Sequence, residues 1–127
     1  MVRIEDIAAH PDFRRLATLG HGIGVDLRYA TDDNFVGHPV YAGIDCAWLR
    51  REAAAALEQA AAWLHDRRPG WRLLVLDALR PQRVQQRLWD ELQGTPLTLY
   101  LAHPERVRYR TQYWATFVLL VTIILLY

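Results

Sequence analysis

Apolar residues recur every three or four positions from Ala47 to Arg67, which is the spacing of one buried helix face. The predicted apolar face contains Leu49, Ala53, Leu57, Ala60 and Leu64. Pro69 and Gly70 follow and end this predicted helix. A second helix is predicted to begin at Pro81, with an inner face of Val84, Leu88 and Leu92. The pattern therefore predicts two main helices.

Two shorter stretches have the patterns of strands. Residues 24–30 alternate between apolar and charged side chains, which is the period of a half-buried strand. Residues 71–76 are almost continuously apolar, as in a strand that is buried on both faces. Residues 31–39 contain Asp, Asn, Gly and Pro and predict a turn. In a chain of 127 residues, these elements predict one α+β domain with two main helices packed on a small sheet.

The composition changes abruptly after Arg106. Fifteen alanines precede this residue and one follows it, and residues 113–127 carry no charge. As a helix, these fifteen residues would reach about 22 Å, which is shorter than the roughly 30 Å hydrocarbon layer of a membrane. A buried strand or the product of a shifted reading frame explains the tail better than a membrane span, although the arginines at 106, 108 and 110 suit a phospholipid surface.

The overall composition limits the classes of function and the compartments that we expect for the chain. A net charge of +1 gives no sign of nucleic-acid binding, and all fifteen cationic residues are arginines. The single cysteine, Cys46, excludes an internal disulfide and is expected to be a small buried residue. Acidic residues at positions 5 and 6 stand where a signal peptide needs apolar ones, so we expect a cytoplasmic protein.

Several motif-like stretches do not have the spacing of known sites. Residues 20–24 alternate glycine with other residues, but no helix follows to bind a phosphate. The loop 32–43 lacks the closing glutamate of a calcium site. His10, His38 and His103 each precede proline, and no two histidines have the helical i, i+4 spacing of a zinc motif. We expect these three histidines in turns or on the surface.

A corner between the strand 71–76 and the second helix contains Asp77 and Arg80. Strand ends that lead into helices often carry site residues, and a guanidinium there can donate to a substrate carboxylate or to an oxyanion. The structural alternative is that Asp77 caps the helix, while Arg80 pairs with Asp77 or with Asp90. The corner by itself leaves both interpretations open.

Five stretches together carry a family resemblance: DLRYAT at 26–31, NFVG at 34–37, Tyr41, DALRP at 77–81 and LW at 88–89. In this order they resemble the N-terminal half of the zinc-dependent D-alanyl-D-alanine dipeptidases, the VanX-type branch of the M15 metallopeptidases. The resemblance covers roughly residues 4–106. Leu79 departs from it, because the family usually has tyrosine before the arginine.

The resemblance implies an α+β fold, one catalytic zinc ion and hydrolysis of the dipeptide D-Ala-D-Ala, a precursor of cell-wall peptidoglycan whose depletion underlies glycopeptide resistance. Arg80 matches the family's transition-state-stabilising arginine. Tyr29, Tyr41 and Asp77 match positions near the substrate pocket. The expected partner is therefore a small dipeptide.

The zinc-binding stretch S-x-H-x-x-G-x-A-x-D and the closing E-x-x-H of the family are both absent from the sequence. His103 lies before the expected position of the first motif and does not replace it. We therefore expect that this chain does not bind zinc and is inactive alone, with residues 1–106 forming the N-terminal part of a dipeptidase domain and residues 107–127 an apolar tail. The alternative is a non-catalytic module that binds carboxylates through Arg80 and docks on a membrane or a partner through residues 117–127.

Overall fold

The computed structural model describes residues 3–41, 43–101, 103–105 and 121–125. Two α-helices are described, α1 (Arg51–Arg67) and α2 (Gln82–Glu91). The strands are β1 (Phe13–Arg15), β2 (Gly24–Val25), β3 (Trp48–Arg50), β4 (Trp71–Val75) and β5 (Val121–Leu125). Four short 3-10 helices are η1 (Ile4–Ala9), η2 (Leu16–Thr18), η3 (Arg28–Ala30) and η4 (Pro96–Tyr100). This mixture of helices and small sheets agrees with the expected α+β class.

The strands form two small sheets. In the larger one, β4 lies in the centre, parallel to β2 and antiparallel to β5. In the smaller one, β1 pairs antiparallel with β3. The register of β2 places Gly24 opposite Leu74, and a Cβ at Gly24 would lie 2.9 Å from the Leu74 side chain. Glycine therefore lets β2 approach β4 without displacing the Leu74 side chain, which any larger residue at position 24 would have to move.

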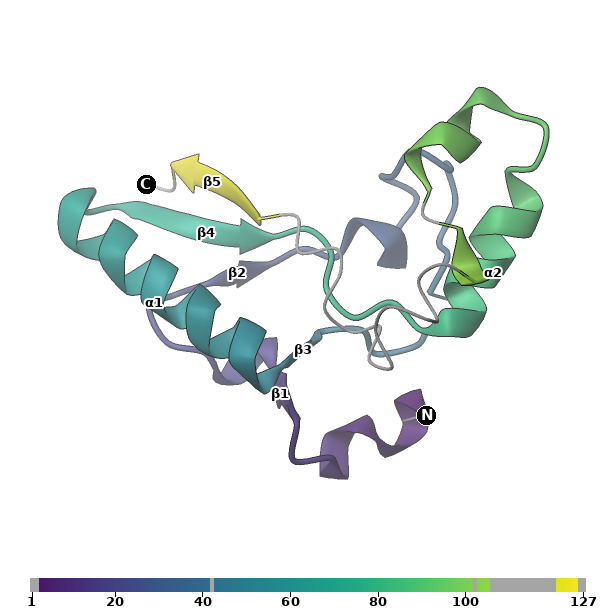
Figure 1. The fold of residues 1–127 in the computed structure, drawn as a ribbon. Helices are drawn as coiled ribbons and strands as arrows, with labels where there is room; N and C mark the ends of the chain where they lie inside the picture. Colours follow the sequence, from purple (N-terminus) through teal and green to yellow (C-terminus); the bar gives the residue numbers. More distant parts are fainter. Residues whose placement is uncertain (1–2, 42, 102, 106–120, 126–127) are drawn as a thin grey trace.

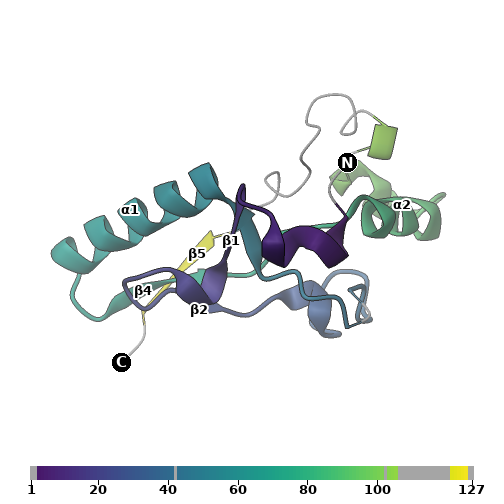
Figure 2. The same ribbon diagram turned by 90° about the horizontal axis from the view of Figure 1, so that it is seen from below.

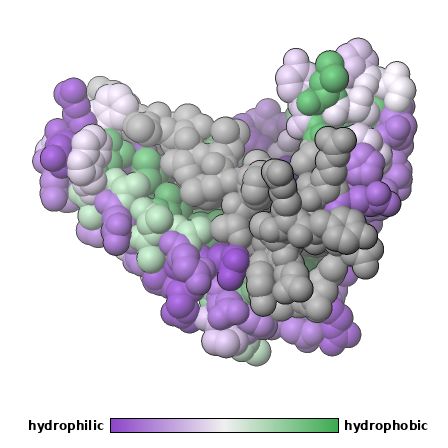
Figure 3. Space-filling model, viewed as in Figure 1, coloured by the Kyte–Doolittle hydropathy of each residue, from purple (hydrophilic) through white to green (hydrophobic). Residues whose placement is uncertain are grey.

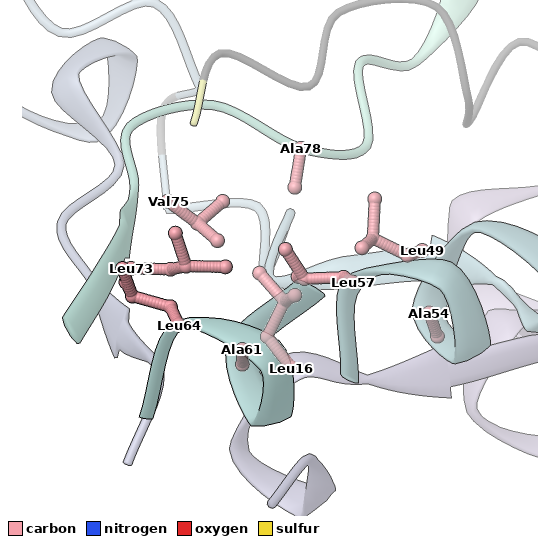
Figure 4. Packing of buried hydrophobic residues seen from close by; sticks show 9 residues of the cluster. All are labelled: Leu16, Leu49, Ala54, Leu57, Ala61, Leu64, Leu73, Val75 and Ala78. Atoms are coloured by element: carbon pink, nitrogen blue, oxygen red, sulfur yellow. The ribbon is translucent and has the colours of Figure 1, made fainter. Parts of the chain in front are cut away.

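Helix α1 covers one face of the larger sheet, whereas α2 and η4 lie at the far side of the molecule (Figures 1 and 2). The main core joins α1 to β4 (Figure 4). Its buried members are Leu16, Leu49, Ala54, Leu57, Ala61, Leu64, Leu73, Val75 and Ala78. A separate cluster of Val40, Tyr41, Cys46, Val84 and Leu88 holds α2. The corner 76–81 connects these two parts of the core.

The predicted helix from Ala47 is wrong at its start, because the chain forms β3 before α1 begins at Arg51. Trp48 and Leu49 are both buried, and β3 pairs with β1, so tertiary packing overrides the helical spacing. The predicted apolar face is also partly wrong, since Ala60 is exposed and the buried positions are Ala54, Leu57, Ala61 and Leu64. The helix ends at Arg67, before the Pro–Gly pair, as predicted.

The strand predicted for residues 24–30 is shorter than its pattern indicates. Only Gly24–Val25 is a strand, although the amides of Asp26 and Arg28 continue the hydrogen bonding to the carbonyls of Val75 and Leu76. Residues 28–30 then form η3. The alternation of apolar and charged residues therefore does not distinguish a strand from a 3-10 helix in this stretch. The predicted positions of β4 and α2 are confirmed, including the buried inner face of Val84, Leu88 and Leu92. Burial of β4 on both faces is not, because Arg72 is exposed.

Most of the predicted tail lies outside the described residues. Its described part is β5, whose backbone pairs with the whole length of β4, from Trp71 opposite Leu125 to Val75 opposite Val121. Among the described residues there is no helix of the length and apolarity that crossing a membrane requires. In Figure 3, apolar surface appears at the tip of the right-hand arm, over η4, whose Leu99 is 85% exposed.

A histidine–carboxylate pair ties the loop 31–39 to α2. Nε2 of His38 bonds to Glu91, which is the main cause of the raised pKa of His38. Because the folded-state pKa is raised, the pair stabilises the folded protein fully below the unfolded-state pKa of about 6.5. This stabilisation is lost as pH rises through the folded-state pKa. An NMR titration should therefore place the His38 inflection above 6.5, and Glu91→Gln should lower the inflection, because it removes the main cause of the raised pKa. An inflection at or below 6.5 in the unchanged protein would contradict this pairing.

Candidate functional site

The corner after β4 places Asp77 and Arg80 inside the protein. The intervening side chains anchor it on two sides, because Ala78 packs into the α1–β4 core and Leu79 packs with Ile7, Phe13 and Trp48. The amide of Leu79 also donates to the carbonyl of Cys46 at 3.2 Å. Asp77 is 1% exposed and Arg80 is 5% exposed. The packing of the two residues between them therefore holds the corner in the core, where both charged side chains are buried.

Arg80 and Asp77 form a hydrogen-bonded ion pair. The Nη2 atom of Arg80 donates to Oδ2 of Asp77 at 2.6 Å, and Nη1 donates to Oε1 of Gln85 at 3.1 Å. The other carboxylate oxygen of Asp77 accepts from the Tyr41 hydroxyl and, at 3.1 Å, from the amide of Ala78. The carboxylate thus has hydrogen-bond donors at both oxygens.

The proposed capping role of Asp77 is wrong, because Pro81 occupies the N-cap position of α2 without a side-chain cap. Arg80 does pair with Asp77, as the structural alternative expected. The carboxylate of Asp90 instead accepts from Gln86 at 2.9 Å.

Tyr29 contacts the same ion pair through the guanidinium of Arg80. The guanidinium carbon of Arg80 lies 4.5 Å from the centre of the Tyr29 ring, within cation–π range. The Tyr29 and Tyr41 rings are 6.1 Å apart, and Tyr29 itself is only partly buried. All four candidate site residues are therefore in one place. Together with Gln85 they form what we call the Arg80 cluster: Tyr29, Tyr41, Asp77, Arg80 and Gln85.

Burial dominates the electrostatics of the Arg80 cluster. It raises the pKa of Asp77, and the guanidinium of Arg80 opposes this rise. Burial alone would lower the pKa of Arg80, but Asp77 and Tyr41 outweigh it, so this pKa is raised. The pKa of Tyr41 is also raised, first by burial and then by the charge of Asp77. Arg80 and Tyr41 consequently remain protonated hydrogen-bond donors at neutral pH.

One donor of the cluster has no acceptor. The Nε atom of Arg80 is buried and, within the described part of the chain, has no hydrogen-bond partner. A buried donor without a partner costs about 1–3 kcal/mol, so the site favours an added acceptor. Because the donor belongs to a guanidinium, a carboxylate or a developing oxyanion is the acceptor that fits best.

The sequence analysis missed Gln85. This residue is 1% exposed and helps to fix the orientation of the guanidinium. It lies between Val84 and Leu88 on the inner side of α2, where the apolar pattern leaves no reason for an amide. A polar residue on the predicted apolar face is the signal that could have identified it.

The described residues do not fit a zinc site. No group of three or more His, Cys, Asp or Glu converges in residues 3–41, 43–101, 103–105 and 121–125. Two of the histidines already have other contacts, because His38 bonds to Glu91 and the His103 ring lies 4.6 Å from Trp89. The zinc ion that the family resemblance implies therefore has no ligand set in this part of the chain.

Cys46 lies beside the cluster as a buried residue, 1% exposed, and burial raises the pKa of its thiol to about 12. We predict that a thiol reagent at neutral pH will not label Cys46 in the folded protein and will label it fully in denaturant. An added exposed cysteine, Ala55→Cys, provides the matched control and should react at once. Labelling of Cys46 as fast as the control without denaturant would show that the packing around α2 is wrong.

Two comparisons with known proteins find similarity to dipeptidases. The sequence model of the peptidase M15 family, described as D-ala-D-ala dipeptidase, matches residues 10–112. The D-alanyl-D-alanine dipeptidase of Escherichia coli K12 is 32% identical over 75 residues, which is 59% of this chain and 37% of that relative. The chain thus aligns with little more than a third of the relative's length. From the extent of the family match, we conclude that the chain belongs to the D-Ala-D-Ala dipeptidase family of the M15 peptidases.

Proposed function

We propose that this chain contributes the oxyanion-stabilising arginine, Arg80, to a site that hydrolyses D-Ala-D-Ala. The observation that carries the proposal is the state of Arg80, whose guanidinium is fixed by Asp77 and Gln85 and retains one buried donor without an acceptor among the described residues. A donor fixed in advance stabilises charge that develops in a transition state without a reorganisation cost. Arg80 therefore suits the oxyanion that forms when a peptide carbonyl is attacked.

The other members of the cluster have distinct roles in this proposal. Asp77 and Gln85 orient the guanidinium, and Tyr41 orients Asp77 through its hydroxyl. Tyr29 covers the guanidinium face and remains partly exposed, so it is placed to contact a small substrate. In the family, zinc would supply the activated water. No step through the metal is assigned to the described residues, because they do not form a ligand set.

We expect a tetrahedral anion to bind the Nε–Hε group of Arg80 more tightly than the substrate does. We expect a phosphinate analogue of D-Ala-D-Ala to shift the NMR signal of the Arg80 Nε–Hε group more strongly than D-Ala-D-Ala itself, because enzymes bind transition-state analogues more tightly than substrates. The signal can be assigned by its loss in Arg80→Lys. If neither compound moves the Arg80 signal while both move signals elsewhere, the proposed role of Arg80 is wrong.

Hydrolysis by the chain alone is not expected. Without a metal and a general base, the main barrier to peptide hydrolysis remains. Elemental analysis of the purified full chain should find substoichiometric zinc, and an assay for D-alanine release should find no turnover above background. Stoichiometric zinc together with turnover would overturn this expectation and would place a complete site in this chain.

A second candidate function, carboxylate binding without hydrolysis, uses the same Nε donor of Arg80, which has no acceptor in the part of the chain that the structure describes. It predicts that D-alanine and D-Ala-D-Ala move the Arg80 signal to a similar extent, with no preference for the phosphinate. The two proposals therefore give different orders of binding in the same titration.

A further inference from the structure

The loop that carries both tyrosines of the Arg80 cluster is organised around one side chain. The loop leaves β2, forms η3 and returns at Tyr41, so its two limbs are residues 28–33 and 37–41. Asn34 lies near its tip and is partly buried. The limbs also meet at the base of the loop, where the amides of Val40 and Tyr41 donate to the carbonyl of Tyr29 at 2.8 and 3.2 Å.

The amide group of Asn34 bridges the two limbs. Its Nδ2 atom donates to the carbonyls of Arg28 and Thr31 on the outgoing limb, at 3.2 and 2.7 Å. The same atom donates to the carbonyl of His38 on the returning limb, at 2.9 Å. Three carbonyls from both limbs therefore converge on one nitrogen and share its two hydrogens.

The oxygen of the same side chain fixes the turn between the limbs. Oδ1 of Asn34 accepts from the amides of Val36 and Gly37, at 2.8 and 3.0 Å. Gly37 has a φ of +85°, a conformation that favours glycine. Asn34 thus uses both ends of its amide, and aspartate could replace only the accepting end.

We propose that Asn34 is a positioning residue, which clamps the loop 28–41 and thereby holds both tyrosines of the Arg80 cluster in place. The proposal rests on the proposed function for its catalytic meaning, but its physical content can be measured without turnover. Asn34 touches neither Arg80 nor Asp77 through a hydrogen bond that the structure shows. It acts through Tyr29, which covers the guanidinium, and through Tyr41, which bonds to Asp77.

The test uses the Nε–Hε signal of Arg80 in the full chain. In the unchanged protein, the Tyr29 ring should shift this signal through its ring current, and burial should slow hydrogen exchange with water. We expect Asn34→Ala to remove the ring-current shift and to accelerate exchange by about tenfold or more, since the bridge from Nδ2 to the carbonyls of both limbs is lost. An unchanged Arg80 signal in a folded Asn34→Ala protein would overturn the proposal.

Two further variants separate positioning from general destabilisation. Asn34→Asp keeps the bonds to Val36 and Gly37 but loses the Nδ2 donor that bridges the limbs. It should therefore change the Arg80 signal as Asn34→Ala does. If Asn34→Ala does not fold, Asn34→Asp tests the proposal instead. Thr31→Ala removes two bonds that stay within the outgoing limb, to the carbonyl of Arg28 and from the amide of Asp33, and should leave Arg80 unchanged. Equal effects of Thr31→Ala and Asn34→Asp on Arg80 would count against a clamp.

Failure of this inference and failure of the proposed function remain distinguishable. If the Asn34 variants release Arg80 but the phosphinate analogue does not bind there, the clamp is supported and the dipeptidase proposal is wrong. If the phosphinate binds at Arg80 equally well in the unchanged protein and in Asn34→Asp, the dipeptidase proposal is supported and the clamp is wrong.

Discussion

Arg80→Leu should lower the free energy of unfolding by about 3–5 kcal/mol, because it leaves the buried carboxylate of Asp77 without its cationic partner. Both side chains of the pair are almost fully buried, at 6% and 2% exposure, so water cannot replace the lost interaction. Urea denaturation of the two proteins measures the difference.

A double variant provides the control for this prediction. Asp77→Asn combined with Arg80→Leu removes the stranded charge as well, so the pair of changes should recover part of the loss seen with Arg80→Leu. A loss below about 1 kcal/mol for Arg80→Leu is the size expected of an exposed pair. Such a result would contradict a buried Arg80 cluster.

Leu88→Ala should lower the free energy of unfolding by about 2–5 kcal/mol. Leu88 is 0% exposed and packs with Val40, Tyr41, Cys46 and Val84, so truncation leaves a cavity between α2 and the loop. Leu99→Ala is the matched control, since Leu99 is 85% exposed and its loss should change stability by no more than about 0.5 kcal/mol. Equal effects of the two substitutions in urea denaturation would show that α2 is not packed as described.

The parts of the fold with a strong local signal could be predicted from the sequence. Helix α1 ends before the Pro–Gly pair, and β4 and the inner face of α2 lie where the apolar pattern places them. The smaller sheet could not be predicted, because strands of three residues carry too little periodicity and the pairing of Phe13 with Arg50 links distant parts of the sequence. The same weakness extended the predicted helix across β3.

The residues of the candidate site were predicted, but of its contacts only the pairing of Arg80 with Asp77 was. The corner pattern singled out Asp77 and Arg80, and the family resemblance added Tyr29 and Tyr41, which the fold brings together. The roles of these residues in binding and catalysis stay predictions. Asn34 was recognised as part of a turn and of the NFVG stretch of the family resemblance, but neither reveals which carbonyls its amide will bridge.

The most direct test is the kcat/KM for D-Ala-D-Ala of a fusion between residues 1–105 of this chain and the remaining part of the E. coli dipeptidase. Arg80→Lys in this fusion should lower kcat/KM by roughly 100- to 1,000-fold, the range for losing one oxyanion donor, mainly through kcat. Arg83→Lys provides the matched control, because Arg83 is exposed and pairs with Glu5, and it should leave kcat/KM unchanged. An active fusion in which the Arg80 and Arg83 variants have the same kcat/KM as the unchanged fusion would contradict the assignment of Arg80 to the oxyanion.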